Sequence, residues 1–587
     1  MILAGSGALG QGFPVCFPCP HLLYQLMEVS LKRIYITITI ALLTSLYGCV
    51  STHPESTIAI PEPTAPITSP EVSPEYLRAH LTAFAHDSMQ GREAGTPGHD
   101  RAVEYLVQQL ERIGAEPAGE GGSYLQSVPL ITNALDLSQP LTVDGVALRP
   151  GIDYVPFDQR VPTRSVSGAE VIYGGRISQA ASMRAEDLEG KFVVVLAEPM
   201  QPILPDTEGE SPFAAAAGIG VTGLEPLIDE FADYLLTPSA GTSFDEEVGP
   251  KPVTILLRDE AAERLIGNSL QRARRGAKGL TLGGDVAFQR SLTPSENIIA
   301  VIPGTDPTLR DEYIALGAHT DHMGIRAAGP LDHDSLRAVN LIIHDQMKGS
   351  SSQSVPPAIR RAAEARVARE HRSASPRPDS IFNGADDDGS GSIGLLALAE
   401  HFSDPENRPR RSILFVWHTA EEKGLIGSEW FTDHPTVPLE NIVAHINIDM
   451  IGRGSKEDIR GGGPDYLQLL GPKRLSTEYA QLIAAVNRRR ERPFRIDEQY
   501  DAPGHPEQYY CRSDHWNYAR YGIPVAFFST GSHADYHQLT DEVEYIDFDH
   551  YAEVVRFVGE IAMAVGNLDE RPTIDGPRPD PTAECKQ

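Results

Sequence analysis

The chain has 587 residues, of which 41% are hydrophobic, and its 81 acidic against 50 basic residues give a formal charge of −31. This length exceeds what one hydrophobic core usually supports, so we expect two or more domains. The acidic balance argues against nucleic acid as a partner, because binding a polyanion requires clustered Lys and Arg.

Residues 1–48 are typical of a secretory signal. A basic pair at 32–33 precedes a mostly apolar run over 34–46, which is too short for a transmembrane helix and is followed by Cys49. The segment resembles the lipoprotein box of bacteria, in which Cys49 is lipidated, and an ordinary signal with a chance cysteine is the alternative. It predicts a protein of a bacterial cell envelope, facing the periplasm or the exterior and touching the membrane through its lipid anchor only. Met27 suits the start of such a signal better than Met1.

The next three segments differ in amino-acid composition and in the secondary structure that they predict. Residues 49–75 are rich in Pro, Ser and Thr and are expected to form an extended tether. Residues 76–135 are predicted to be the N-terminal part of a catalytic domain, and their apolar spacing up to Gly114 indicates helices. Residues 136–290 contain short β-type runs between Gly, Pro and Asp turns, which predicts an inserted β-rich module.

Residues 291–570 alternate between buried strands and helices. Dense apolar runs at 413–417, 444–448 and 525–528 are predicted strands, and helix-compatible segments lie between them. This alternation favours an α/β fold with a mostly parallel mixed central sheet flanked by helices. Residues 571–587 are expected to be a tail.

Five side chains of metal-ligand type are placed along this pattern, and three of them come within a few residues of a predicted strand end. Two imidazoles and three carboxylates without cysteine suit zinc or a similar divalent ion. Because ligands gather beyond the carboxyl ends of parallel strands, we expect a common site. The five are His319, Asp387, Glu422, Asp449 and His537.

Asp387 is the candidate bridge between two ions, because it lies on a Gly-flanked loop that can approach both. One ion would then be held by His319, Asp387 and Asp449. The other would be held by Asp387, Glu422 and His537. We therefore expect two zinc ions per chain, with other divalent ions possible.

Two further acidic residues have predicted roles. Asp321 follows His319 by two residues and could orient its imidazole. Glu421 stands beside a ligand and is the predicted general base, taking a proton from the water held by the ions and passing it to the leaving amine. Taken singly, each of these residues has a structural alternative, such as a turn or helix cap for Asp387. Their order and shared setting favour catalysis.

Seven motifs together resemble metallopeptidase family 28, the co-catalytic di-zinc aminopeptidases and their carboxypeptidase relatives. The resemblance implies a zinc exopeptidase-like fold, peptide substrates, and the ligand and base roles given above. It also implies that residues 136–290 are a protease-associated domain. The motifs are Gly-Arg-Glu-Ala-Gly-Thr-Pro-Gly (91–98), Gly-Ala-His-Thr-Asp-His-Met-Gly (317–324), Asn-Gly-Ala-Asp-Asp-Asp-Gly-Ser-Gly (383–391), Ala-Glu-Glu-Lys-Gly-Leu-Ile-Gly-Ser (420–428), Asn-Ile-Asp-Met-Ile-Gly (447–452), Arg-Ser-Asp-His-Trp-Asn-Tyr (512–518) and Tyr-His-Gln-Leu-Thr-Asp (536–541).

The chain departs from the family pattern between His319 and Asp387, which the family separates by a short loop. Here residues 326–378 intervene, and their segment 359–372 is Arg-rich and helix-compatible. Since ligands flank the insertion on both sides, we hypothesise a basic lid at the mouth of the site that biases substrates towards acidic groups. A solvated surface insertion is the alternative.

An aminopeptidase is the leading expectation for function. A carboxypeptidase acting on acidic C-terminal residues would need arginines to bind a terminal carboxylate, and Arg512 or the insertion could supply them. Glutaminyl cyclisation and a non-catalytic, receptor-like relative are less favoured, because all five ligands and Glu421 are present. Cys511 and Cys585 could pair in an oxidising compartment. The oligomeric state is not predicted.

Overall fold

The computed structural model describes residues 69–157, 163–198, 205, 207, 211–225, 228, 239–241, 251–326, 329–347, 355–370, 376–583 and 585–587. The predicted signal, Cys49 and most of the predicted tether therefore lie outside the described residues. Within the described part, no helix combines the length and the apolar character needed to cross a membrane.

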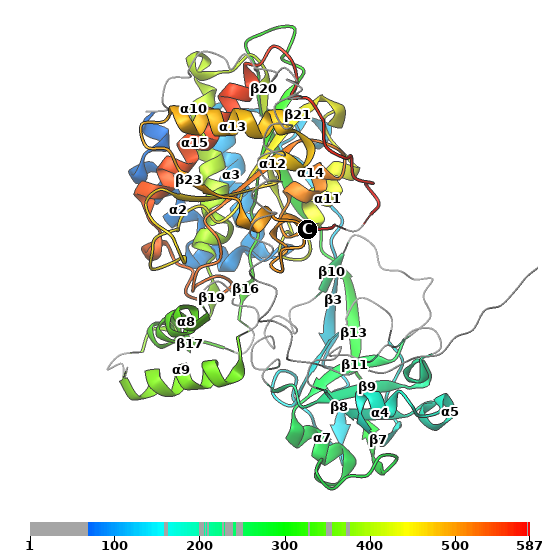
Figure 1. The fold of residues 1–587 in the computed structure, drawn as a ribbon. Coiled ribbons are helices and arrows are strands. Elements are labelled where there is room, and N and C mark those ends of the chain that lie inside the picture. The colour runs from blue at the N-terminus through cyan, green and yellow to red at the C-terminus, as the bar shows by residue number, and fades with distance from the viewer. Residues whose placement is uncertain are drawn as a thin grey trace, which may run out of the picture. The chain divides into compact units, whose positions relative to one another are not determined.

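A nine-stranded mixed sheet is built from strands between residues 116 and 128 and between residues 295 and 529 (Figure 1). The strand order is β1-β14-β20-β15-β21-β24-β22-β23, with β2 beside β14. Strands β20, β15, β21 and β24 run parallel to their neighbours in this series, so their carboxyl ends meet at one edge. The bounds are β1 Glu116–Pro117, β2 Leu125–Val128, β14 Ser295–Ile302, β15 Tyr313–His319, β20 Ser412–His418, β21 Ile442–Ile448, β22 Tyr466–Leu470, β23 Arg495–Asp497 and β24 Val525–Ser529.

Helices cover both faces of this sheet, which explains why its central strands are apolar throughout. Residues of β15, β20 and β24 pack on one face against α11 (Ile426–Asp433) and α14 (His515–Ala519). Helix α10 (Gly391–Ser403) contacts β15 and packs against α2, α3 and α15. The last three span Pro74–Phe84, Pro97–Ile113 and Phe548–Gly566, and α13 (Thr477–Arg489) packs on α15. The predicted α/β fold is confirmed.

Local sequence sets the limits of these helices. The Ser73 hydroxyl accepts the Tyr76 N–H and caps α2. Gly114 ends α3 with a left-handed φ of 71°, a conformation that glycine adopts at little cost. The helices expected after residue 76 therefore form with the expected stop.

A second sheet, of eight strands in the order β5-β4-β12-β7-β8-β9-β11-β6, falls within residues 136–290. It encloses apolar clusters of its own, one on each side of β8, and a separate three-stranded sheet has the order β10-β3-β13. Identity as a protease-associated domain stays a prediction. The bounds are β3 Ile131–Asp136, β4 Thr142–Val143, β5 Val146–Ala147, β6 Tyr154–Pro156, β7 Glu170–Arg176, β8 Phe192–Leu196, β9 Gly218–Thr222, β10 Ser239–Gly241, β11 Val253–Leu257, β12 Lys278–Gly283 and β13 Ala287–Leu292; the helices are α4 Ile177–Ala180, α5 Ala185–Leu188 and α7 Asp259–Ile266.

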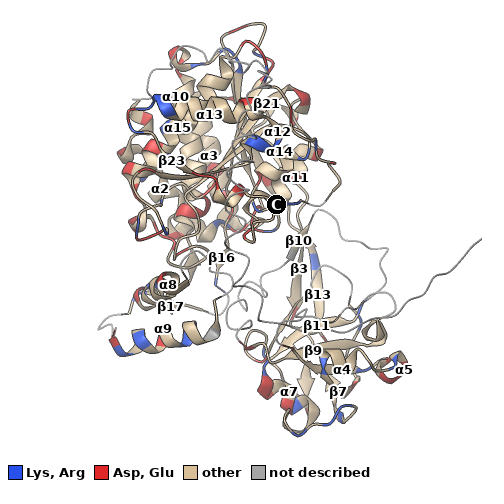
Figure 2. Ribbon diagram, viewed as in Figure 1, with Lys and Arg blue, Asp and Glu red and all other residues tan. Residues whose placement is uncertain are grey.

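The insertion at 326–378 is a helical hairpin. Helices α8 (His333–Met347) and α9 (Pro357–Glu370) pack through a small apolar cluster that includes Val339, Ile343 and Val367. Its two ends meet where β17 (Leu331–Asp332) pairs antiparallel with β18 (Pro378–Asp379). The predicted Arg-rich helix is α9, whose basic residues are visible in Figure 2, and α8 was not foreseen.

Cys511 and Cys585 form a disulfide bond. The bond fastens the C-terminal tail beside residues 499–511, where the Gln587 side chain also accepts the Tyr510 N–H. This resolves the pairing that the sequence left open.

Candidate metal centre

The predicted ligands converge at the carboxyl edge of the central sheet. His319 is the last residue of β15, and Asp449 follows β21 by one residue. Glu421 and Glu422 come just after β20, whose His418 lies opposite His319 in register. Asp387 belongs to the turn Ala385–Ser390 that precedes α10, and its peptide bond to Asp388 is cis.

The two carboxylate oxygens of Asp387 face two different histidines. Oδ1 lies 3.3 Å from His319 Nε2, and Oδ2 lies 3.2 Å from His537 Nε2. Each histidine also has a second carboxylate nearby: Asp449 Oδ1 is 3.8 Å from His319 Nε2, and Glu422 Oε2 is 3.1 Å from His537 Nε2. This geometry has the same two halves as the predicted division of ligands around a bridging Asp387.

Glu421 and Asp321 lie beside the first half. Glu421 Oε2 is 3.9 Å from His319 Nε2, and the Asp321 carboxylate accepts the backbone N–H of Glu421 at 3.0 Å. Asp321 was predicted to orient the His319 imidazole, and the contact is made by its backbone: His319 Nδ1 bonds the Asp321 carbonyl at 3.1 Å, while the Asp321 carboxylate lies 3.7 Å away. Asp321 therefore positions both the imidazole and Glu421, with different atoms.

His322 belongs to the motif 317–324 but was not predicted to be a ligand. The structure places it in the second half of the site, with Asp387 and Glu422. Its Nδ1 lies 2.7 Å from Glu422 Oε1 and 3.9 Å from Asp387 Oδ2. The group His322, Asp387 and Glu422 has the geometry to hold a metal ion. His322 is buried, whereas the His537 side chain is 24% exposed. The His-Thr-Asp-His spacing was the available signal, since it brings a second imidazole into the same loop.

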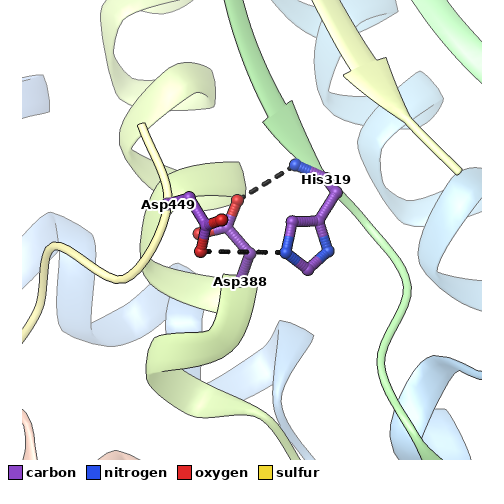
Figure 3. Close-up of side chains that lie close together, drawn as sticks. All are labelled: His319, Asp388 and Asp449. Atoms are coloured by element: carbon purple, nitrogen blue, oxygen red, sulfur yellow. Dashed lines mark hydrogen bonds and ion pairs between the residues drawn. The ribbon is translucent and has the colours of Figure 1, made fainter. Parts of the chain in front are cut away.

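Asp388 is a further carboxylate that sequence reasoning passed over. It forms a group with His319 and Asp449 (Figure 3). Its Oδ2 accepts the His319 N–H at 3.0 Å, and its Oδ1 accepts the N–H groups of Gly391 and Met450 at 3.0 and 3.2 Å. These bonds tie the ends of β15 and β21 to the start of α10. Asp388 thus holds together the backbone segments that present the ligands.

Other buried side chains support the ligands from behind. The Asp541 carboxylate accepts the backbone N–H groups of Asp386 and Asp387 at 3.0–3.1 Å. The Ser513 hydroxyl donates to Asp449 Oδ2 at 2.8 Å and in turn accepts from the Asn447 side chain. The Asp449 carboxylate and the backbone that carries Asp387 are therefore held by neighbours from distant parts of the chain.

Unpaired polar atoms at the centre fit a bound cation. His319 Nε2, His322 Nε2 and Asp387 Oδ2 are buried and make no hydrogen bond. Buried polar atoms normally find a partner, so three orphans among converging imidazoles and carboxylates call for a shared one. An imidazole and carboxylate donor set is the one that zinc prefers in catalytic sites.

Burial and charge adjust the acid–base groups. Burial raises the pKa of Glu421 well above its usual value, and the Asp449 and Glu422 carboxylates add to this against the opposing effect of His319. For Glu422, burial acts upward but the charges and hydrogen bonds of His537 and His322 outweigh it and lower the pKa to about 2. The two adjacent glutamates thus differ: one stays an anion suited to a ligand, and the other is disposed to accept a proton.

Comparisons with known proteins agree with this site. Residues 297–562 match the model of Peptidase family M28. Leucine aminopeptidase 1 of Penicillium rubens is 30% identical over 201 residues, which are 31% of this chain and 48% of that protein. The chain thus spans about half of this relative. An aminopeptidase structure from Aneurinibacillus sp. strain AM-1 has the same fold, with a TM-score of 0.50, 18% identity and coverage of 86% of this chain and 98% of that chain.

The prediction of a bacterial cell envelope is wrong by these comparisons. The matching relatives include the vacuolar membrane protease of Pyricularia oryzae, 37% identical over 77 residues, which are 13% of this chain and 7% of that protein. Together with the fungal leucine aminopeptidases, it points to a eukaryotic rather than a bacterial origin. A resemblance to a lipoprotein box rests on a few residues around Cys49, which short apolar runs can reproduce by chance.

Proposed function

We propose that this chain is a zinc-dependent exopeptidase, specifically an aminopeptidase that hydrolyses the N-terminal peptide bond of its substrates. One observation carries the proposal: the two oxygens of Asp387 face two histidines, with the buried Glu421 beside them. The M28 domain match over residues 297–562 and the leucine aminopeptidase relatives support the same conclusion.

The residues that would hold two zinc ions are Asp387 and the side chains gathered near each of its two carboxylate oxygens. His319 and Asp449 serve one ion, and Glu422 serves the other with His537 or His322. Zinc bound there would polarise the scissile carbonyl and lower the pKa of the attacking water. Glu421 takes the proton of that water as the new carbon–oxygen bond forms. It then delivers the proton to the nitrogen of the breaking peptide bond, which leaves as an amine.

Tyr536 is a second positioning group next to the site. Its ring is buried and stacks on His537 with 3.9 Å between centroids, and its hydroxyl accepts from Arg512 at 2.9 Å. The phenol is thereby held in one place, where it can orient a substrate carbonyl. Arg512 also donates to the Glu507 carbonyl. Since two of its donors are engaged within the protein, the geometry favours the aminopeptidase over a carboxypeptidase in which Arg512 binds a terminal carboxylate.

A peptide library followed by mass spectrometry tests the proposal. We expect ladders shortened from the amino end that disappear with a chelator and return with zinc. Glu421→Gln should keep the metal content but reduce kcat/KM by at least about 10³-fold, since it removes the proton acceptor. Glu422→Gln is the matched variant, and it should lose metal. Shortening from the carboxyl end would transfer the assignment to a carboxypeptidase. A zinc-loaded protein that cleaves nothing would overturn it.

A further inference from the structure

A second cluster of metal-type side chains lies outside the centre described above. One ligand atom each from His333, Asp379 and Glu542 lies within 4.8 Å of the other two. His333 begins α8, Asp379 ends β18, and Glu542 follows the segment that carries His537. The three residues therefore join both ends of the inserted hairpin to the loop 531–545.

The histidine is oriented as a metal-binding imidazole would be. His333 Nδ1 lies 2.8 Å from Asp379 Oδ2, and Nε2 lies 3.2 Å from the Tyr545 hydroxyl. Its side chain is 1% exposed, so both contacts are shielded from water. Imidazole ligands commonly use one nitrogen for the ion and hydrogen-bond the other to a neighbouring group. The 2.8 Å between His333 Nδ1 and Asp379 Oδ2 is also short enough for both atoms to be ligands of one ion.

Negative charge is crowded around Glu542. Burial raises the pKa of Glu542 to about 8; the hydrogen bond from Asn383 opposes this shift, while the carboxylates of Asp379, Asp541 and Asp87 add to it. The nearby Arg377 guanidinium pairs with Glu544 at 2.8 Å. A dication among these carboxylates would relieve their repulsion and favour the ionised form of Glu542.

An unsatisfied oxygen beside the cluster is an independent sign of a missing ligand. Asn383 is 2% exposed, and its amide nitrogen donates to Glu542 at 2.9 Å and to Asp87 at 2.8 Å. These two carboxylates fix which amide atom is nitrogen. The remaining oxygen, Asn383 Oδ1, is buried without a hydrogen-bond partner. An ion, or water bound to it, could satisfy this buried oxygen of a residue that already donates to Glu542.

We infer that His333, Asp379 and Glu542 bind a further divalent cation at the base of the inserted hairpin. The imidazole makes a zinc-class ion better suited than magnesium or calcium, which prefer oxygen ligands alone. The ion fastens β18 and the start of α8 to loop 531–545. The inference does not depend on the proposed peptidase activity.

Contacts along α8 show what the fastening would support. Arg337 lies 3.5 Å from Asp535 and over the Tyr545 ring, and Asn340 donates to Thr540 at 3.4 Å. All three acceptors belong to loop 531–545, which also presents His537. With the cation in place, α8 is held against this loop by both its first residue and its side. The hairpin of α8 and α9 then stabilises the position of loop 531–545.

Zinc stoichiometry tests the inference. The full chain is saturated with zinc, freed of unbound ion by gel filtration, and measured for zinc per chain by mass spectrometry. We expect three equivalents for the wild type and two for the Asp379→Asn/Glu542→Gln double variant. Asp569→Asn is the control, because this exposed carboxylate pairs with Arg410 at 2.6 Å and is not part of the cluster, and this variant should keep all three. Equal zinc content in the wild type and the double variant would overturn the site.

A single substitution tests the inference if the double variant does not fold. Glu542→Gln alone keeps an oxygen to accept from Asn383, and it should weaken the binding of one zinc equivalent at least tenfold in a calorimetric titration. Asp387→Ala should disrupt the central site and still retain the equivalent at His333. Loss of every equivalent in Asp387→Ala, or an unchanged titration of Glu542→Gln, would each refute the inference. Both results are independent of whether any peptide is cleaved.

Discussion

Replacing Arg92 tests how the metal-type ligands are held in place. This residue is fully buried, and its guanidinium donates to the Phe84 carbonyl at 3.4 Å and to three backbone carbonyls near the ligands: Thr320 at 2.9 Å, Asn383 at 2.6 Å and Gly384 at 2.9 Å. Thr320 directly follows His319, and the other two carbonyls belong to the loop that leads to Asp387. One side chain therefore links the loops that carry a ligand for each half of the site.

The expected cost of Arg92→Met follows from these bonds. Three hydrogen bonds from a charged donor contribute about 1.5 kcal/mol each at the low end of their range, and their loss leaves buried carbonyls unpaired. We expect the free energy of unfolding to fall by roughly 4 kcal/mol and kcat/KM to fall at least about tenfold. Arg92→Lys keeps the charge but not the planar fork, so about half of the loss should remain.

Urea unfolding followed by tryptophan fluorescence measures this loss selectively. All three tryptophans, Trp417, Trp430 and Trp516, lie in or beside the central sheet, so their signal reports on this part of the chain alone. A loss below about 1 kcal/mol with unchanged kcat/KM would refute the argument, because the three carbonyls would then be satisfied without the guanidinium.

Three further outcomes are expected. Ser513→Ala removes the donor to Asp449, so zinc affinity should fall about 10- to 100-fold while circular dichroism stays the same; unchanged affinity would show that Asp449 needs no such partner. Cys585→Ser opens a loop of 74 residues and should lower the free energy of unfolding by about 4 kcal/mol, with wild type in reductant behaving alike. The pKa of Glu542 is raised from 4.5 to about 8 in the folded protein, so the folded state binds its proton more tightly and stability is lost as pH rises between these values. In chelator, the wild type should therefore lose up to roughly 4 kcal/mol relative to Glu542→Gln between pH 4.5 and 8, and parallel stability curves for the two proteins would contradict this.

The strands could be predicted from the sequence, whereas the contacts between side chains far apart in the chain could not. Predicted strands such as 413–417 and 444–448 form within β20 and β21, because a buried strand needs a short run of apolar residues and nothing else. The metal-type residues at the strand ends could be predicted from the sequence in the same way. His319 and Asp449 follow such runs directly, and parallel strands bring their carboxyl ends to one edge of the sheet.

The sequence by itself thus determined the α/β fold class, the helix ends at residues such as Gly114, and which residue types stand at the strand ends. Only the tertiary structure decided that His322 meets Glu422, that Arg92 links two ligand loops, and that His333 meets Glu542. Partners in these pairs are separated by about 100 to nearly 300 residues. Local spacing carries no information about such distances, because they are set by how strands are ordered in the sheet and how loops pack over its edge.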